Sequence, residues 1–461
     1  MSVAVIVLPT GRSRTLTCPL RVTAADYRSL MPPRPTRLSA LAVGLVVAVT
    51  GCTATDQPAG PVPVSGPSPA ETTRTPAPAP HQATAPSASP RTPGDKPGHE
   101  PGNEPGKASH PSCVAQAMER MDLAERAAQL LMVGVPADST APPPSAVVAV
   151  RDLAVGSVIL TGRSAAGVKA TAALVESLQR LAEGPTTQAV GLEVAVDQEG
   201  GQVQVLSGPG FSTIPDALTQ GLLPPAQLRS QARTWGAQLA AAGITVNLAP
   251  VADTVPAGVD NDPIGDFDRE YATRPAAVTA SATAFAAGML AGGVAPVVKH
   301  FPGLGRASGN TDTTAGVVDT VTTRRDPYLQ PFRAAVDADT PYVMVATASY
   351  QRIDPGRLAA FSPVIVERLL RRDLGFDGVV ISDDLGAARA VVDVPVGRRA
   401  TQFVAAGGDV VLTVVPEQAP AMVAALVQRA RAVPTFGTAV AEAARRVLTR
   451  KAVAGLLPCR R

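Results

Sequence analysis

The stretch that decides the fold covers residues 295–305 and reads APVVKHFPGLG. It starts as a continuous apolar run and ends abruptly in a charged Lys-His pair. A second run of this kind, GVVISDDL at 378–385, ends in two aspartates. A buried strand that presents charged side chains at its carboxyl end is typical of the active-site edge of an α/β barrel. The two strand ends therefore predict one shared functional site.

Apolar segments alternate with amphipathic helical segments from residue 113 to the end of the chain. Uninterrupted apolar strands separated by helices favour a parallel sheet that is buried on both faces. Eight such units predict a single-domain (β/α)8 barrel of the TIM type over 113–461, with an open doubly wound sheet as the alternative. The predicted strands are 130–135, 157–160, 192–197, 244–251, 295–301, 342–348, 378–383 and 409–414. The predicted helices are 166–183, 226–242, 273–291, 328–338, 362–373, 396–406 and a last one near 438–453.

The N-terminal region has the pattern of an export signal. A short apolar run over 38–49 follows two arginines and ends in Thr-Gly before Cys52. A basic segment, a short apolar core and small residues before a cleavage point describe a signal peptide, and a cysteine at this point resembles a bacterial lipid-attachment site. We expect residues 1–51 to be the signal region, with translation starting at Met31. The chain would be exported and anchored through Cys52 to the outer face of the membrane; an ordinary signal or a short anchor helix is the alternative.

A proline-rich segment separates this signal from the folded part. Residues 52–112 contain almost no large apolar side chains, so they cannot form a core and predict a disordered, extended tether. Cys113 and Cys459 bracket the folded part. Exported proteins form disulfides, and the first and last elements of a barrel are neighbours, so we expect Cys113 and Cys459 to pair. Two free thiols are the alternative.

The composition excludes several classes of function. The net charge is only +3 and aromatic residues make up 3%, which argues against nucleic-acid binding. His300 is the only histidine in 113–461 and cysteines are not clustered there, which argues against a His/Cys zinc site. A Gly-x-Ser-x-Gly turn, typical of serine hydrolases, does not occur. We expect a monomer that needs no metal and no cofactor.

Polar residues gather where five of the predicted strands end. A single aspartate after a strand often only caps the next helix. Five such positions at the same pole of one barrel are better explained by a site. These residues are Asp197, Asn247 with Asp253, Lys299 with His300, Thr347, and Asp383 with Asp384.

Four motifs around these residues resemble glycoside hydrolase family 3, and most closely its single-domain bacterial β-N-acetylhexosaminidases. The similarity covers roughly 115–455. It implies a retaining hydrolase that cleaves terminal β-linked N-acetylglucosamine, with cell-wall fragments as a source of substrate. A β-glucosidase of the same family and a non-catalytic saccharide-binding lipoprotein are the alternatives. The motifs are DQEGG at 197–201, NLAPVAD at 247–253, KHFPGLG at 299–305 and GFDGVVISDDL at 375–385.

The resemblance also implies roles for individual residues. Asp383 matches the nucleophile, because an ionised carboxylate suits attack on an anomeric carbon of oxocarbenium character. By position alone, Asp384 could also be the nucleophile, but we interpret it as a residue that supports Asp383. Arg269 lies in a divergent stretch, where a surface salt bridge is the alternative role. The residues implied to hold the sugar are Asp197, Arg269, Lys299 and His300.

The general acid departs from the family pattern. Related enzymes place an Asp-x-His pair on the loop after KHFPG, and here the pair reads Asp312 and Thr314. A threonine hydroxyl does not release a proton near neutral pH. Three interpretations follow: Asp312 is itself the acid/base, catalysis is limited to good leaving groups, or turnover has been lost. Gln202, where relatives carry Arg, and Ser349, in a stretch where relatives carry a nearby His, are further departures.

Overall fold

The structure is a computed structural model, and it describes residues 3–7, 13–17 and 110–458. The chain divides into two units, Met1–Pro97 and Gly98–Arg461. In the first, β1 (Val3–Val7) and β2 (Ser13–Thr17) pair as an antiparallel hairpin upstream of Met31. The rest of the predicted signal region, Cys52 and the tether up to residue 109 lie outside the described residues.

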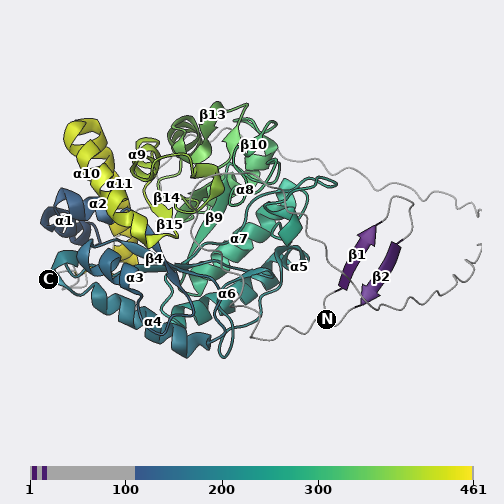
Figure 1. Cartoon of the computed structure of the whole chain (residues 1–461), viewed down its shortest axis with the longest axis horizontal. Helices are drawn as coiled ribbons and strands as arrows, with labels where there is room; N and C mark the ends of the chain where they lie inside the picture. Colours follow the sequence, from purple (N-terminus) through teal and green to yellow (C-terminus); the bar gives the residue numbers. More distant parts are fainter. Residues whose placement is uncertain (1–2, 8–12, 18–109, 459–461) are drawn as a thin grey trace, which may run out of the picture. The chain divides into compact units, whose positions relative to one another are not determined.

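The second unit is built on an eight-stranded parallel sheet (Figure 1). Neighbouring strands pair in sequence order around the sheet, and β15 returns to pair with β3. An isolated parallel bridge between Ile381 and Val410 joins the two remaining edges, so the sheet is a nearly closed barrel and not an open doubly wound sheet. The strands are β3 (Leu131–Pro136), β4 (Ser157–Thr161), β5 (Glu193–Val196), β8 (Val246–Asn247), β9 (Ala295–Phe301), β11 (Tyr342–Val345), β14 (Val379–Ser382) and β15 (Val411–Thr413).

All eight predicted strands are present, and the fourth differs most in length. Regular pairing in the predicted strand 244–251 is confined to Val246–Asn247, because Pro250 has no N–H to donate to a neighbouring strand. Pairing resumes at a bridge between Val251 and Lys299. This bridge brings the NLAPVAD and KHFPG segments together at the carboxyl end of the barrel.

Helices surround the barrel (Figure 1). All the predicted helices are present, but 362–373 forms a π-helix, η7 (Val364–Asp373), in which Leu374 N–H donates to the Leu369 carbonyl. The last helix begins at Pro434, four residues before its predicted start. The α-helices are α1 (His110–Arg120), α2 (Leu123–Ala128), α3 (Pro144–Val147), α4 (Gly167–Leu181), α5 (Ala217–Gly221), α6 (Pro225–Ala241), α7 (Pro275–Ala291), α8 (Gln330–Asp337), α9 (Val396–Ala405), α10 (Ala419–Ala432) and α11 (Pro434–Val453).

Apolar side chains fill the barrel, and α11 closes its amino-terminal end. Alternate strand residues, such as Ile159, Met344 and Leu412, form an interior cluster that also includes Val447 of α11. The Lys451 Nζ donates to the Gln129 side chain at 2.7 Å and to the Gly191 carbonyl at 2.9 Å, just ahead of β3 and β5. The opposite, carboxyl end is left for the site.

The helix α1 packs at this closed end, in a small cluster with Val190, Leu448 and Leu457. Its Cys113 is buried and disulfide-bonded. Cys459 lies outside the described residues, so its pairing with Cys113 stays a prediction. Among the helices that the structure describes, none is long and apolar enough to span a bilayer.

Short strands extend the carboxyl end of the barrel into a rim. After β5, the chain forms a small hairpin of β6 (Gln198–Gly200) and β7 (Val203–Gln204). A three-stranded sheet of β10 (Val318–Asp319), β12 (Ser349–Tyr350) and β13 (Asp354–Leu358) stands beyond β9 and β11. These additions enlarge the surface around the predicted strand ends.

Candidate active site

A cavity of about 470 Å³ opens where the barrel strands end. It is lined by apolar side chains from inside the barrel, including Ile159, Met344 and Leu412, and by polar residues from the loops. The structure therefore brings together the strand ends that the sequence singled out. All six predicted catalytic and sugar-binding residues line this cavity: Asp197, Arg269, Lys299, His300, Asp312 and Asp383.

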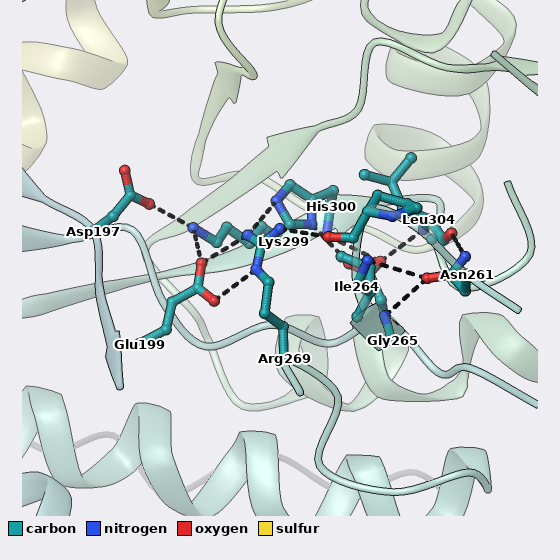
Figure 2. Close-up of polar contacts among 12 residues, drawn as sticks. Asp197, Glu199, Asn261, Ile264, Gly265, Arg269, Lys299, His300 and Leu304 are labelled. Atoms are coloured by element: carbon teal, nitrogen blue, oxygen red, sulfur yellow. Dashed lines mark hydrogen bonds and ion pairs between the residues drawn. The ribbon is translucent and has the colours of Figure 1, made fainter. Parts of the chain in front are cut away.

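One side of the cavity is an ion-paired network, the sugar wall, formed by Asp197, Glu199, Arg269, Lys299 and His300 (Figure 2). The buried Lys299 Nζ lies 2.6 Å from Asp197 Oδ1 and 2.6 Å from Glu199 Oε1. Arg269 binds both oxygens of Glu199, through Nε at 2.9 Å and Nη2 at 2.8 Å. Arg269 is thus held in a bidentate pair inside the site, and not in a surface salt bridge.

Charge compensation keeps this network ionised. Burial alone would raise the pKa of Glu199, but the charges of Arg269 and Lys299 outweigh it and hold that pKa at about 2. Burial likewise opposes the charge on Lys299, whose pKa is nevertheless raised by Asp197 and Glu199. Within residues 110–458, the Asp197 carboxylate accepts a hydrogen bond from Lys299 through Oδ1. Its Oδ2 therefore remains open to accept from a ligand hydroxyl.

Asp253 fixes the orientation of His300. This carboxylate is fully buried and accepts from His300 Nδ1 at 2.7 Å. Its other oxygen accepts the backbone N–H of His300 at 3.2 Å and of Leu304 at 2.8 Å. His300 Nε2 then faces Arg269 Nη2 at 3.4 Å. When Nδ1 carries the hydrogen, it donates to Asp253, and Nε2 is left to accept from Arg269 Nη2. The imidazole is thereby fixed within the sugar wall.

Asn261 connects the loops on either side of this histidine. Its Oδ1 accepts the N–H groups of Ile264 and Gly265, each at 3.1 Å, and its Nδ2 donates to the Leu304 carbonyl at 2.9 Å (Figure 2). The first pair starts the turn η4 (Gly265–Phe267), which precedes Arg269. The second bond holds the chain that follows KHFPG. The divergent stretch around Arg269 is therefore folded against the motif it serves.

The two aspartates after β14 differ in how many acceptor sites remain open. Asp383 is half-buried, and within the described residues its carboxylate accepts one hydrogen bond, from the Asp384 N–H at 2.9 Å. Asp384 accepts four backbone N–H groups, two on each oxygen: Gly386 at 2.8 Å and Val414 at 3.0 Å, and Ala387 at 2.8 Å and Ala388 at 3.1 Å. Four acceptances saturate a carboxylate. Asp383, and not Asp384, is therefore free to act as a nucleophile.

Asp312 lies on the acid loop, defined here as residues 303–316. The loop starts at Gly303, whose φ of 123° favours glycine. The Asp312 side chain is exposed at the mouth of the cavity. Partial desolvation there, together with the Asp383 and Asp384 carboxylates, raises the pKa of its carboxyl to about 6, while His300 and Arg269 oppose the rise. A carboxyl with this pKa is protonated for a substantial fraction of the time in mildly acidic solution.

The positions that depart from the family pattern lie away from the cavity. Thr314 is exposed and does not line the cavity. Gln202 is also exposed, and its carbonyl accepts from Arg163. Ser349 belongs to β12, where its N–H donates to the Val317 carbonyl. Within 110–458, no group of three or more His, Cys, Asp and Glu side chains could hold a metal ion.

Sequence reasoning missed the supporting role of two buried carboxylates. Glu199 lies inside DQEGG and Asp253 ends NLAPVAD, so both positions belong to motifs that were recognised. Asp253 was placed at the predicted site without a role and Glu199 was not singled out, because their functions depend on partners about 50 to 70 positions away in the sequence. The available signal was a carboxylate two residues after a predicted strand, in a sequence that also places Lys and His at the end of a neighbouring strand.

Comparisons with known proteins agree with this geometry. The chain is 52% identical to the solved structure of a β-N-acetylhexosaminidase from Beutenbergia cavernae, with a TM-score of 0.70 over 72% of this chain and 98% of that one. It is 29% identical to a solved family 3 β-N-acetylglucosaminidase from Paenibacillus, with a TM-score of 0.65 over 73% of this chain and 63% of that one.

A curated relative shows the same similarity. The chain is 36% identical over 270 residues to the beta-hexosaminidase LpqI of Mycobacterium tuberculosis, which covers 56% of this chain and 68% of the relative. The sequence profile described as the N-terminal domain of glycosyl hydrolase family 3 matches residues 122–450, a span that contains the barrel and every lining residue of the cavity. The chain therefore belongs to glycosyl hydrolase family 3.

Proposed function

We propose that this protein is a retaining β-N-acetylhexosaminidase that hydrolyses terminal β-linked N-acetylglucosamine. The observation that carries the proposal is the pairing of two unlike carboxyls in one cavity. Asp383 has open acceptor sites, and the pKa of Asp312 is raised to about 6. A retaining glycosidase requires one carboxyl that can donate a proton and a second whose oxygens are open for attack on the anomeric carbon. The names of the similar proteins support the same activity.

The sugar wall supplies the binding contacts. The open Asp197 oxygen can accept from a sugar hydroxyl, and Arg269 and Lys299 offer donors from fixed positions. Because these side chains are already held by Glu199 and by each other, little conformational entropy is lost when the sugar binds. The sugar is thereby placed with its anomeric carbon toward Asp383.

The reaction proceeds in two displacements. Asp383 attacks C1 and forms a glycosyl ester, while the proton on Asp312 moves to the departing glycosidic oxygen. The leaving group departs as an alcohol, and Asp312 is left ionised. Asp312 then takes a proton from water, whose oxygen attacks C1 and releases Asp383. The product keeps the β configuration.

Release of 4-nitrophenol from its N-acetyl-β-glucosaminide tests this function, with the β-glucoside as the matched control substrate. We expect turnover of the first, and the first product seen by proton NMR should be the β anomer. Faster turnover of the glucoside would instead indicate a β-glucosidase. Saturable binding of N-acetylglucosamine without turnover would indicate a saccharide-binding protein and would overturn the proposal.

The proposal extends to where the enzyme acts. The sequence of residues 1–51 supports export, Cys52 supports lipid attachment, and 52–112 supports a tether, with cell-wall fragments as the source of substrate. A fully extended polyproline conformation of 60 residues would reach on the order of 190 Å. Replacing Cys52 with Ser should move the protein from the membrane fraction to the medium. Retention of the variant in the membrane would contradict lipid anchoring at this residue.

A further inference from the structure

We infer that Asp384 is a positioning residue for the general acid: it fixes the turn formed by residues 385–394, and this turn holds the acid loop over Asp383. The inference rests on the proposed function, because it concerns how Asp312 reaches the substrate. It gives a role to a carboxylate that lines the cavity but has no acceptor site left for a sugar.

The first step is the contact between Asp384 and the turn. Three of its four hydrogen bonds are to consecutive N–H groups, those of Gly386, Ala387 and Ala388. The fourth, from Val414, ties the same carboxylate to the end of β15. Asp384 thus fixes the start of the turn to two barrel strands, β14 and β15, which form the rigid part of the site.

The second step is the contact between the turn and the acid loop. The N–H of Arg389 donates to the Asp312 carbonyl at 3.1 Å, and the N–H of Ala390 donates to the Thr311 carbonyl at 3.0 Å. Both donors lie in η8 (Arg389–Val391), directly after the residues that Asp384 binds. Two consecutive backbone bonds fix both the position and the direction of the loop at the residue that carries the acid.

Arg399 of α9 holds the same turn from the other side. This buried guanidinium donates to the carbonyls of Leu385 at 2.9 Å, Gly386 at 2.8 Å and Val394 at 2.7 Å. The turn is therefore fixed through its N–H groups by Asp384 and through its carbonyls by Arg399. Substituting either residue should therefore loosen the turn. Only substitution of Asp384 also removes a charge that acts on Asp312.

The titratable and charged groups that face Asp312 come from three directions. Asp383 and Asp384 follow β14, His300 ends the KH pair of β9, and Arg269 follows η4. The two carboxylates favour the protonated acid, and the two basic groups oppose it. Asp384 is consequently able to act on Asp312 both through the turn and through its charge. Both effects would assist an acid loop that has threonine at position 314, where the family resemblance implies histidine.

The test compares Asp384→Asn with the wild type on two substrates of the same sugar, a 4-nitrophenyl glycoside and a methyl glycoside with a poor leaving group. Asparagine keeps one acceptor oxygen but sets an NH₂ donor against the N–H groups of Ala387 and Ala388. Since acid catalysis contributes roughly 10²- to 10⁴-fold, we expect a loss of about 100-fold in kcat/KM on the methyl glycoside and less than about tenfold on the nitrophenyl glycoside.

A double-mutant cycle with Asp312→Asn separates positioning from a general structural effect. If Asp384 acts through Asp312, the double variant should be no slower on the methyl glycoside than Asp312→Asn alone. The alkaline limb of the pH profile should also move to lower pH in Asp384→Asn, because one negative charge beside Asp312 is gone. Additive losses, or equal losses on both substrates with an unmoved limb, would overturn the inference.

Arg399→Met keeps the inference testable if Asp384→Asn does not fold, as judged by circular dichroism. We expect the same selective loss on the methyl glycoside and the same absence of additivity with Asp312→Asn. An additive result would again overturn the inference. Absence of turnover in the wild-type protein on both substrates would overturn the proposed function and this inference together, so the two failures are distinguishable.

Discussion

The sugar wall and the acid loop face each other across one cavity, but they are held in place by different forces. The wall is buried and fixed by ion pairs among side chains, with Lys299 between Asp197 and Glu199. The loop is exposed over 312–316, and backbone hydrogen bonds to the 385–394 turn fix it at Thr311 and Asp312. Substrate binding thus depends on charge compensation, whereas proton transfer depends on loop position. Variants of the two regions should therefore affect binding and proton transfer to different extents.

The largest effect is expected for Asp383→Ala, which removes the nucleophile that both regions serve. Loss of a covalent nucleophile should lower kcat by about 10⁴-fold or more. The affinity for N-acetylglucosamine, measured by calorimetry, should remain close to that of the wild type because the sugar wall is intact. A variant that keeps more than a tenth of the wild-type kcat would reject Asp383 as the nucleophile.

Glu199→Gln breaks the wall and removes none of the hydrogen bonds described for the acid loop. Without this carboxylate, Lys299 and Arg269 remain buried with a neutral partner. Breaking one side of a buried ion pair costs about 3–5 kcal/mol, so we expect a loss of that size in the free energy of unfolding and a raised KM. Urea unfolding measures the first, and initial rates measure the second. The exposed Glu176→Gln, whose partner is Arg180, is the matched control and should change stability little.

The pH dependence of the free energy of unfolding tests the ion pairs of the sugar wall separately from the acid loop. The pKa of Glu199 is about 2 in the folded protein and about 4.3 in an unfolded chain. Its ionisation therefore stabilises the fold above about pH 4.3, and this contribution is lost as the pH falls toward 2. The wild type should lose more stability than Glu199→Gln over this range. Parallel curves for the two proteins would show that the ion pairs are not formed in solution.

Asp312→Asn breaks the loop side alone. The proton of Asp312 must be present for the first displacement and its pKa is about 6, so the rate on a methyl glycoside should fall as the pH rises above about 6. The variant should lose this limb and about 10²- to 10⁴-fold in kcat/KM on that substrate. A limb that persists in Asp312→Asn would assign the acid to another group.

The smallest effect is expected for Thr314→His, which introduces the residue that the family resemblance implies at this position. Thr314 is exposed and outside the cavity, so the new imidazole should change kcat/KM by about twofold or less, comparable with the roughly 0.5 kcal/mol of other exposed substitutions. A gain of tenfold or more would show that the loop moves far enough to bring residue 314 to the substrate.

The sequence predicted the barrel because its strands are apolar and its motifs lie at strand ends. Periodicity located strands such as 295–301 and 342–348 within a few residues. It could not indicate the π-helical hydrogen bonds of 364–373, which depend on packing and not on the apolar pattern. The helix α10 was also missed, since its alanine-rich sequence between prolines gives little periodic contrast.

Within the site, sequence reasoning assigned roles to the residues predicted to hold the sugar, but it could not assign the contacts of the residues that support them. Asp197, Lys299 and Asp383 belong to motifs whose chemistry is readable from residue type. The roles of Asp253 and Asp384 depend on which N–H groups lie within 3.2 Å, and three-dimensional folding determines that distance. Arg399 lies outside every motif and carries no local signal of its contact with the turn.

The packing of α1 against α11 has a consequence for how an anchored enzyme would work. Both helices lie at the closed end of the barrel, so a chain that arrives at His110 joins the domain on the side away from the cavity. If Cys52 is held in the lipid surface, pulling on the tether leaves the cavity mouth unobstructed. The enzyme would then meet saccharides that approach from beyond the membrane, and its reach would vary with the length of residues 53–109 without any change in the catalytic groups.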